Sequence, residues 1–316
     1  MNELKFYKDL LLKNYDEITT DIIIDGIKTN KKVTLRVNTL KASVEEIISE
    51  FNSLNIEFKQ VDWYKDAFIM ENIQEIDLQD LEIYKQGKIY LQNLSSMLPA
   101  IILNPKENEN ILDMCAAPGG KTTQMACLSG NKAFITAIER NKIRGEKLKY
   151  NLQKQGAGTV NVMFEDARNL SDYFKFDKIL LDAPCSGSGT ENVFKSNFTK
   201  ELIEKSAKTQ EALLKKGLKL LKQGGELVYS TCSILKDENE CILEKCLKNS
   251  DCRLKSFELS DEIKCLPSKV DEVKTIAPNE YFEGFFVAKI IKEVGSEMWD
   301  KISPFTFLTS GFKNLQ

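Results

Sequence analysis

Six apolar segments alternate with helical segments between residues 108 and 290, and this alternation limits the fold more than any other feature of the sequence. Short aliphatic segments separated by helical periodicity are typical of a parallel sheet with helices on both faces. The expected strands cover 110–115, 133–139, 161–166, 178–183, 226–231 and 285–290. The expected helices lie near 122–129, 142–155, 200–221 and 238–249. We therefore predict an α/β fold of the Rossmann-like, doubly wound type, whose ligands bind at the carboxyl ends of strands.

A smaller α/β unit is expected in front of this sheet. Its segments follow the order β-α-β-β-α-β, a split layout that many RNA-recognising domains use. They cover 33–40, 43–54, 56–61, 66–70, 74–84 and 88–94. The chain is thus divided into a helical lead-in at 1–30, an RNA-recognition-like α/β domain at 31–104, a larger α/β domain at 105–292 and a C-terminal tail at 293–316.

Composition excludes several classes of protein. None of the 316 residues is a histidine, which excludes Ser-His-Asp triads, Cys-His proteases and histidine-ligated metals. The net charge is −3, so a nucleic-acid partner must be met by local basic patches. The first 17 residues are too charged for a signal peptide, and no apolar stretch approaches the roughly 18 residues of a membrane span. We expect a cytoplasmic monomer with no membrane partner.

The chain holds eight cysteines, none of them in a Cys-x-x-Cys pair. In a reducing compartment these are expected to be free thiols. Four of them lie close together in the sequence but at irregular spacing, at Cys241, Cys246, Cys252 and Cys265. We expect these four to be small buried apolar side chains rather than zinc ligands, and we expect no bound metal.

The first strand of the larger domain runs into Asp113–Thr122, with the sequence DMCAAPGGKT. Small residues at such a turn let the backbone approach a ligand, and the following helix offers unpaired N–H groups. The ending GGKT fits a phosphate-binding loop of a nucleotide hydrolase, but Cys115 stands where its first glycine belongs. S-adenosylmethionine needs the close turn without the phosphate cradle. The residues alone leave three interpretations open, which are a nucleoside triphosphate, S-adenosylmethionine and a plain tight turn.

Acidic residues follow the next two strands. Glu139 could accept hydrogen bonds from both ribose hydroxyls of a nucleoside cofactor, and Asp166 could contact its adenine amino group. Each signal is weak alone, because a solvated carboxylate is equally consistent with the sequence. Their positions at successive strand ends favour a nucleoside site.

Two cysteines lie at the ends of two further strands, Cys185 after Asp182-Ala-Pro and Cys232 after Ser230-Thr. Adjacent strands would bring both thiols to one edge of the sheet, beside the turn, where thiolates can be reactive. Two thiols and a methyl donor suit methylation of pyrimidine carbon 5, because a thiolate added at carbon 6 gives carbon 5 enolate character. Asp182 could favour cytosine by hydrogen bonding near N3 and the exocyclic amine.

Six motifs together resemble the Nop/Sun family, the Fmu-like and RsmB-like RNA cytosine-5-methyltransferases. They are LRVNTLK, IYLQNLSSMLPA, CAAPGGKT, DAPCSGSGT, YSTCS and EGFFVAK, and they span about 33–290. The resemblance implies a methyltransferase sheet preceded by an RNA-recognition-like unit. It also implies that Cys232 is the nucleophile and that Cys185 assists product release, two roles that spacing alone leaves unassigned. The residues it implies at or beside S-adenosylmethionine are Cys115, Ala116, Ala117, Pro118, Gly119, Gly120, Lys121, Glu139, Arg144, Asp166 and Asp182.

Two stretches are basic enough to meet RNA. Residues 28–41 carry Lys28, Lys31, Lys32, Arg36 and Lys41 with no acid, and residues 140–154 carry six basic residues against one acid. Phosphate contacts from the first stretch would position the substrate, with ribosomal RNA favoured over transfer RNA. The second stretch is equally consistent with a solvated helix. A catalytically idle RNA-binding scaffold and a DNA substrate are the remaining alternatives.

Overall fold

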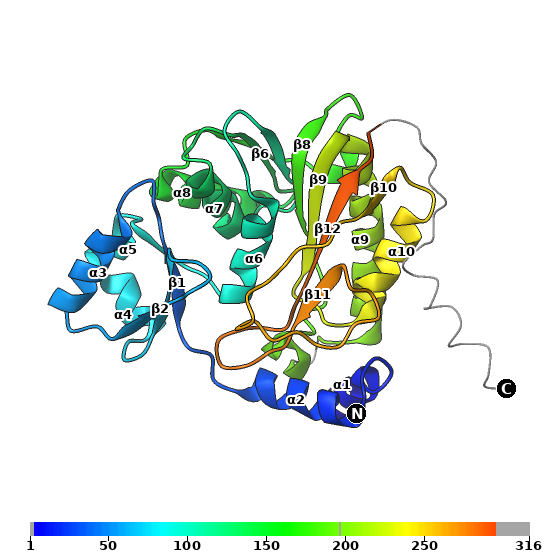
Figure 1. The fold of residues 1–316 in the computed structure, drawn as a ribbon, viewed down its shortest axis with the longest axis horizontal. Coiled ribbons are helices and arrows are strands. Elements are labelled where there is room, and N and C mark those ends of the chain that lie inside the picture. The colour runs from blue at the N-terminus through cyan, green and yellow to red at the C-terminus, as the bar shows by residue number, and fades with distance from the viewer. Residues whose placement is uncertain (1–2, 196, 295–316) are drawn as a thin grey trace.

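The computed structural model describes residues 3–195 and 197–294, so most of the expected tail at 293–316 lies outside the described residues. Figure 1 shows a small sheet at the left, a larger sheet at the right and two helices beneath them. The α/β class and the two-sheet organisation predicted from the sequence are confirmed. Among the described residues, no helix combines the length and the apolar character needed to cross a membrane.

The expected helical lead-in at 1–30 contains two helices, α1 (Glu3–Leu11) and α2 (Glu17–Lys28). The Asp16 side chain caps α2 by accepting a hydrogen bond from the backbone N of Thr19 at 2.7 Å. The helices pack buried apolar residues against the larger domain, and the Tyr7 hydroxyl donates to the carbonyl of Ser188 at 2.6 Å. The lead-in therefore packs on the larger domain through an apolar cluster of its own.

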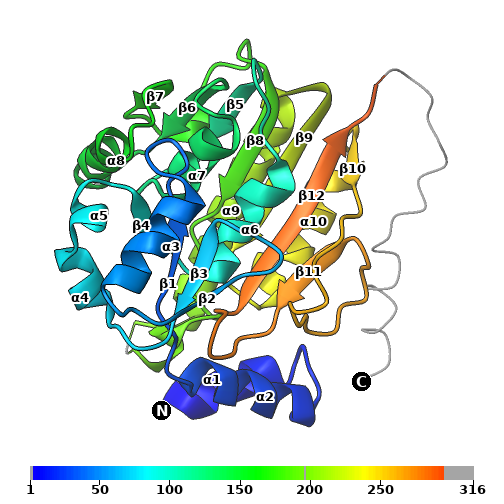
Figure 2. The same cartoon turned by 60° about the vertical axis from the view of Figure 1, so that its left-hand side comes forward.

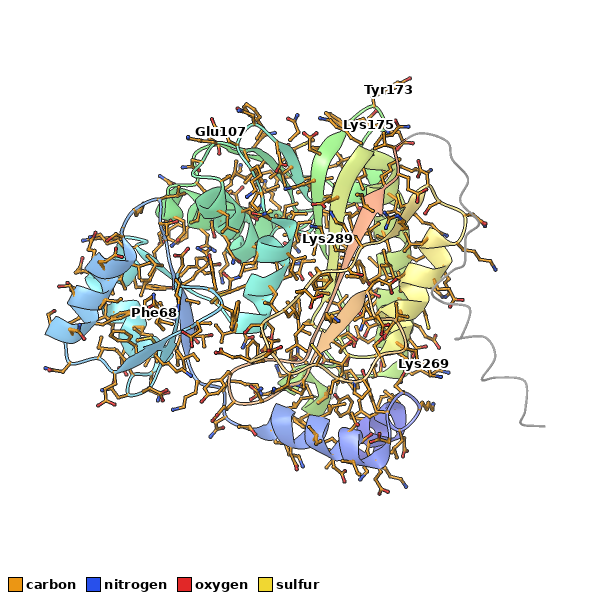
Figure 3. All side chains as sticks on the ribbon, viewed as in Figure 1. Phe68, Glu107, Tyr173, Lys175, Lys269 and Lys289 are labelled. Atoms are coloured by element: carbon orange, nitrogen blue, oxygen red, sulfur yellow. The ribbon has the colours of Figure 1, made fainter. Side chains whose placement is uncertain are left out.

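The small sheet has the order β2-β3-β1-β4 and is antiparallel throughout. In chain order its elements are β1 (Thr34–Val37), α3 (Val44–Ser53), β2 (Phe58–Gln60), β3 (Ala67–Met70), α4 (Glu75–Asp80), α5 (Glu82–Lys85) and β4 (Ile89–Leu91). Leu35, Val37 and Phe68 fill the core between this sheet and its own helices, and Figure 3 labels Phe68 there. Because side chains alternate along a strand, Arg36 points to the opposite face, toward the larger domain.

The larger sheet has the order β10-β12-β9-β8-β5-β6-β7, with β11 paired to β12. Its elements and covering helices are α6 (Leu94–Leu103), β5 (Asn110–Asp113), α7 (Gly120–Leu128), β6 (Phe134–Ile138), α8 (Lys142–Gln155), β7 (Val160–Met163), β8 (Phe176–Asp182), α9 (Lys200–Leu220), β9 (Leu221–Thr231), α10 (Glu240–Leu247), β10 (Cys252–Leu254), β11 (Val273–Ile276) and β12 (Phe285–Lys292). Strands β5 to β9 are parallel, as predicted.

The last strand departs from the predicted parallel sheet. Strand β12 runs antiparallel to β9, and it also pairs antiparallel with the preceding strand β11. The chain passes from β11 to β12 without a helix, which an antiparallel pair allows and a parallel pair does not. Figure 2 shows β12 alongside β9 with β11 beside it.

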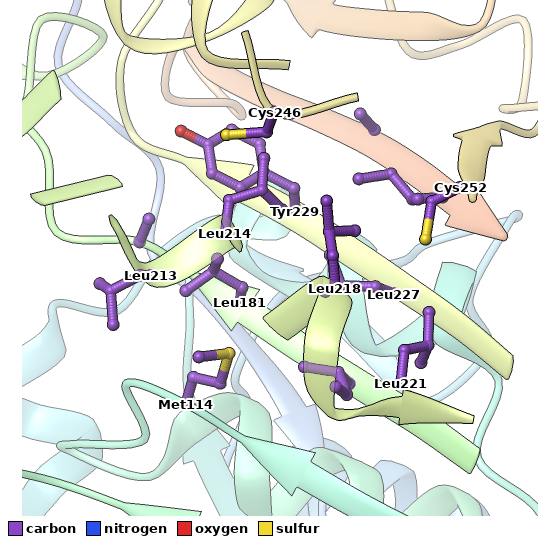
Figure 4. Packing of buried hydrophobic residues seen from close by; sticks show 14 of the residues in the cluster. Met114, Leu181, Leu213, Leu214, Leu218, Leu221, Leu227, Tyr229, Cys246 and Cys252 are labelled. Atoms are coloured by element: carbon purple, nitrogen blue, oxygen red, sulfur yellow. The ribbon is translucent and has the colours of Figure 1, made fainter. Parts of the chain in front are cut away.

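Two apolar layers cover the larger sheet. One layer, with α9 and α10, includes Leu214, Tyr229 and Cys246 (Figure 4), and the other contains residues of α6, α7 and α8. All eight cysteines are free, and Cys246 and Cys252 are buried in the first layer, as expected. The expectation of burial is wrong for Cys241, which is partly buried, and for Cys265, which is exposed. The doubly wound arrangement leaves the carboxyl ends of β5, β6, β8 and β9 as a common edge.

Candidate functional site

The turn after β5 is built from tight backbone contacts. Gly119 has a φ of +108°, and a Cβ atom there would lie 2.9 Å from Leu148 Cδ1, so glycine is required. Two side chains of α8 hold the carbonyls of the turn. Arg144 donates to the Ala117 carbonyl and Asn151 donates to the Pro118 carbonyl, both at 2.7 Å. The run of small residues is therefore a rigid cradle at the start of α7.

The ending GGKT does not form a phosphate loop. Thr122 Oγ1 donates to the buried carboxylate of Asp113 at 2.7 Å, and Lys121 Nζ donates to Asp182 and to Ser96, each at 2.7 Å. Burial raises the pKa of Asp113 to about 6. In a nucleotide hydrolase the lysine of this motif contacts phosphate and the threonine hydroxyl contacts Mg²⁺. Here both groups are hydrogen-bonded within the protein instead. This geometry disfavours the nucleoside triphosphate interpretation.

A cavity of about 290 Å³ lies at the common edge of the sheet. Of the expected site residues, it is lined by Cys115, Ala117, Glu139, Arg144, Asp166, Asp182, Cys185 and Cys232. Burial raises the pKa of the Cys115 thiol well above its ordinary value, so this thiol is neutral. Residues from the ends of five strands, β5 to β9, therefore meet in one cavity.

The two acids expected at a nucleoside lie on one side of this cavity. Glu139 is only 4% exposed, and its carboxylate accepts from the backbone N of Asn141 at 2.8 Å with Arg144 Nη1 at 3.6 Å. Asp166 accepts two hydrogen bonds from Arg168, at 2.6 and 2.9 Å, which lower its pKa to about 2. Glu139 thus keeps acceptor capacity toward the cavity beside a longer ion pair with Arg144, whereas Asp166 is held by two short hydrogen bonds from Arg168.

A second cavity of about 260 Å³ lies between the small unit and the larger domain. It shares Cys115, Ala117 and Asp182 with the first cavity, and it includes Ala116, Pro118, Gly120 and Lys121 of the turn together with Tyr90, Asn93, Ser96 and Glu283. Four residues expected at the cofactor, Ala116, Pro118, Gly120 and Lys121, therefore line the second cavity and not the first. Asp182, which also accepts from Ser230 Oγ at 2.7 Å, stands at the junction of the two.

The two strand-end thiols lie together, as the strand order implied. Cys185 Sγ and Cys232 Sγ are 2.7 Å apart, and both side chains are partly exposed on the first cavity. The hydrogen bond to Cys232, together with burial, raises the pKa of Cys185 well above that of an ordinary thiol. Cys185 therefore keeps its proton at neutral pH and can donate it in a hydrogen bond to the Cys232 sulfur.

The expectation that residues 28–41 contact RNA is wrong for their central residues. Arg36 is fully buried, and its guanidinium donates to Gln92 at 2.8 Å, to the Gly120 carbonyl at 2.9 Å and to Thr123 at 2.7 Å. Lys31 donates to the carbonyls of Gly26 and Asn279. These cations are satisfied internally and tie the small unit and α2 to the larger domain. The alternation of the LRVN strand could have indicated the inward direction of Arg36.

The second basic stretch is solvent-facing. On α8, Lys142, Lys147 and Lys149 are exposed, while Arg144 lines the first cavity. The carboxyl-terminal end of α8 brings Lys154 beside Lys41, Lys85 and Lys88 of the small unit, around an open hollow. Burial and the neighbouring charge of Lys41 lower the pKa of Lys154. We call Lys142, Lys147, Lys149, Lys154, Lys41, Lys85 and Lys88 the basic surface.

Family comparisons cover both α/β units. The model of the 16S rRNA methyltransferase RsmB/F family matches residues 100–291. A model described as the ferredoxin-like domain of RsmF/B-like methyltransferases matches residues 6–77. The matched regions include β1, β2 and β3 of the small sheet and the strand ends of the larger sheet.

Curated relatives are similar over most of this chain. A tRNA (cytosine(72)-C(5))-methyltransferase of Pyrococcus horikoshii is 39% identical over 217 residues, which are 68% of this chain and 55% of that protein. A ribosomal RNA small subunit methyltransferase F of Shewanella woodyi is 34% identical over 294 residues, 87% of this chain and 60% of that protein. The chain thus spans between 55% and 60% of the length of these relatives.

Two solved structures have the same fold over nearly the whole chain. A methyltransferase homolog protein from Pyrococcus horikoshii has a TM-score of 0.77 at 31% identity, covering 91% of this chain and 99% of that one. NSun6 from Pyrococcus horikoshii, solved with SFG, has a TM-score of 0.82 at 25% identity, covering 93% and 98%. Both likenesses extend across the small unit and the larger domain.

Proposed function

The chain belongs to the 16S rRNA methyltransferase RsmB/F family, and we propose that it methylates carbon 5 of a cytosine in RNA, using S-adenosylmethionine and a covalent adduct at Cys232. The observation that carries this proposal is the pair of thiols 2.7 Å apart, in a cavity that also holds Glu139 and Asp182. The names of the relatives in the rRNA and tRNA classes support RNA as the substrate. We retain ribosomal RNA as the favoured class.

The first cavity fits S-adenosylmethionine. The cradle of small residues admits a nucleoside closely, and the buried Glu139 is placed to accept hydrogen bonds from ribose hydroxyls. The neighbour solved with SFG, an analogue of S-adenosylmethionine, supports this assignment. Cys115, Ala117, Arg144 and Asp166 complete the walls, and S-adenosylmethionine supplies the methyl group to carbon 5.

Cys232 carries the covalent step. Its thiolate adds to carbon 6 of cytosine, forming an S–C bond and moving the ring electrons toward carbon 5, which then takes the methyl group. Asp182 accepts a hydrogen bond from the exocyclic amine, and Lys121 holds the Asp182 carboxylate in place at 2.7 Å. This arrangement selects cytosine, because uracil presents no amino group there.

Cys185 serves the release step. Its pKa is raised first by the hydrogen bond to Cys232, then by burial and by the charge of Cys232, and the two influences of Cys232 end once that sulfur is bound to carbon 6. Cys185 can then lose its proton to solvent and accept the proton from carbon 5. The electrons of that C–H bond restore the ring double bond, and the bond between carbon 6 and the Cys232 sulfur breaks. Cys185 thus completes the reaction that Cys232 begins, and no histidine is needed.

The test is methyl transfer followed by nucleoside analysis. The protein is incubated with methyl-labelled S-adenosylmethionine and either small-subunit ribosomal RNA or bulk transfer RNA, and the RNA is digested for mass spectrometry. Label in 5-methylcytidine from the ribosomal RNA is the expected result. Label in another nucleoside contradicts the proposed reaction, and label only in transfer RNA contradicts the substrate class.

Glu139→Ala should weaken S-adenosylmethionine binding by roughly 10- to 100-fold. Losing hydrogen bonds to a charged acceptor costs roughly 1.5–3 kcal/mol. Isothermal titration calorimetry measures the change, and Glu146→Ala, which removes an exposed carboxylate on α8, is the matched control. Equal affinities of Glu139→Ala and the wild type would remove Glu139 from the cofactor site.

Changing Lys142, Lys147 and Lys149 together to Gln should flatten the salt dependence of RNA binding. For single-stranded RNA, each lysine–phosphate pair contributes about 0.7 to the slope of log K against log salt, so the triple change should reduce the slope by roughly 2. The control changes the exposed Lys215, Lys219 and Lys245 of α9 and α10, on the other face of the sheet, to Gln. Parallel salt plots for the two triple variants would show that the basic surface on α8 does not bind RNA.

A further inference from the structure

One buried carboxylate connects the two cysteine loops. Glu238, in the short 3₁₀ helix Lys236–Glu238 that follows β9, is 0% exposed. Its Oε1 accepts from the backbone N of Ser186 at 2.8 Å and from Gln210 Nε2 at 3.3 Å. Its Oε2 accepts from Ser186 Oγ and Ser233 Oγ, each at 2.6 Å. Because Ser186 follows Cys185 and Ser233 follows Cys232, one side chain holds the residue next to each thiol.

The environment of Glu238 is unusual for a buried acid. Within the part of the chain that the structure describes, no lysine or arginine forms an ion pair with it, and four neutral donors take the place of a cation. Burial raises the pKa of Glu238, while its hydrogen bonds from Ser186, Ser233 and Gln210 act in the opposite direction. Removing a carboxylate from water without a counter-ion is costly, so such a group is stable only with its donors in place. The four donors thus stabilise the Glu238 carboxylate, and the carboxylate in turn holds the donors in position.

Further hydrogen bonds lock the same two loops around Glu238. Ser188 Oγ and Ser233 Oγ lie 2.7 Å apart, and the backbone N of Gly189 donates to the Cys232 carbonyl at 3.0 Å. On the other side, the Tyr229 hydroxyl donates to the Glu238 carbonyl at 2.6 Å. The distance between the thiols is therefore set by a connected polar network with Glu238 at its centre.

We propose that Glu238 is the positioning residue for the thiol pair, holding the Cys185 and Cys232 loops at the separation that lets one sulfur act on the other. The inference rests on the proposed function only for what the two cysteines do. Glu238 contacts neither sulfur by hydrogen bond and acts through Ser186 and Ser233. It is thus distinct from the nucleophile and from the release residue.

The charge of Glu238 has a measurable effect on the pKa of Cys185. After Cys232 and burial, the negative charge of Glu238 is the next influence that raises the pKa of Cys185. The other titratable groups near this thiol are Cys232 and Tyr229 of the β9 segment and Asp182 at the end of β8. Replacing Glu238 by a neutral residue would remove this charge and would also loosen the hydrogen bond between the two thiols. Both effects would lower the pKa of Cys185.

The experiment compares Glu238→Gln with Glu240→Gln. Glu240 is also buried, at 4% exposed, and burial also raises its pKa, so its change tests the loss of a buried carboxylate two residues away. The rate of alkylation of Cys185 and Cys232 by iodoacetamide is followed against pH by peptide mass spectrometry. For Glu238→Gln we expect the midpoint for Cys185 to fall by about one pH unit or more, and kcat to fall at least tenfold with an unchanged KM for S-adenosylmethionine. Glu240→Gln should leave both values unchanged.

A pH profile of Glu238→Gln that matches the wild type, or an equal shift in Glu240→Gln, overturns the inference. Should thermal melting show that Glu238→Gln is unfolded, Ser186→Ala gives the second test, because it keeps the acid and removes one bond to the Cys185 loop. Its Cys185 midpoint should also fall, and an unchanged midpoint overturns the inference. The alkylation profile needs neither RNA nor methyl transfer, so a failure of the proposed reaction is distinguishable from a failure of the positioning role.

Discussion

Cys232→Ala should abolish methylation of RNA, with a loss of activity on the order of 10⁴-fold or more, typical for removal of a covalent nucleophile. Carbon 5 of cytosine is too weak a nucleophile to take a methyl group until a thiolate has added at carbon 6. In the proposed mechanism Cys185 takes the proton from carbon 5 and does not attack the base. Incorporation of labelled methyl groups into RNA measures the effect.

The matched control is Cys241→Ala, which removes a partly buried thiol on α10 that lines neither of the two cavities. This variant should retain wild-type activity. Binding of S-adenosylmethionine to Cys232→Ala should change by less than about threefold, since the Glu139 side of the cavity is intact. Methylation by Cys232→Ala at the wild-type rate would remove Cys232 from the reaction.

Cys185→Ala should accumulate an RNA–protein complex that survives denaturing gel electrophoresis. Attack by Cys232 and methyl transfer are still possible in this variant. The Cys185 thiol, which lies 2.7 Å from the Cys232 sulfur and accepts the carbon 5 proton, is missing. The adduct therefore forms and fails to collapse, and most of the protein should migrate as the complex, whereas the wild type shows little.

The double variant Cys185→Ala/Cys232→Ala should form no such complex, because the thiol that attacks is absent. Two results would contradict the assigned roles. Normal turnover by Cys185→Ala would make Cys185 a structural residue, and a trapped complex in Cys232→Ala would exchange the roles of the two thiols.

Much of the fold was predictable because hydrophobic periodicity reports burial directly. The alternation after residue 108 indicated the parallel strands β5 to β9, and the order of segments before residue 94 indicated the small split sheet. The site followed from the strand positions, since the carboxyl ends of parallel strands meet at one edge. Glu139, Cys185 and Cys232 line one cavity for this reason.

What the sequence did not indicate depends on contacts between distant segments. Arg36 is as basic as any RNA-binding residue, and only the docking of the small unit on α7 buries it against Gly120 and Thr123. Glu238 likewise sits in a polar run, KDENE, that is typical of a solvated loop. Its burial arises because the loops of β8 and β9 close over it. The direction of β12 is a matter of its pairing with β9, β10 and β11, which no local propensity determines.

The most direct test of the central claim is peptide mapping of the trapped complex. Cys185→Ala is incubated with RNA and S-adenosylmethionine, digested with nuclease and trypsin, and analysed by tandem mass spectrometry. We expect a methylated cytidine nucleotide attached to the peptide that contains Cys232. A nucleotide on any other residue, or a complex with no nucleotide on Cys232, would contradict the claim that this thiol attacks the base.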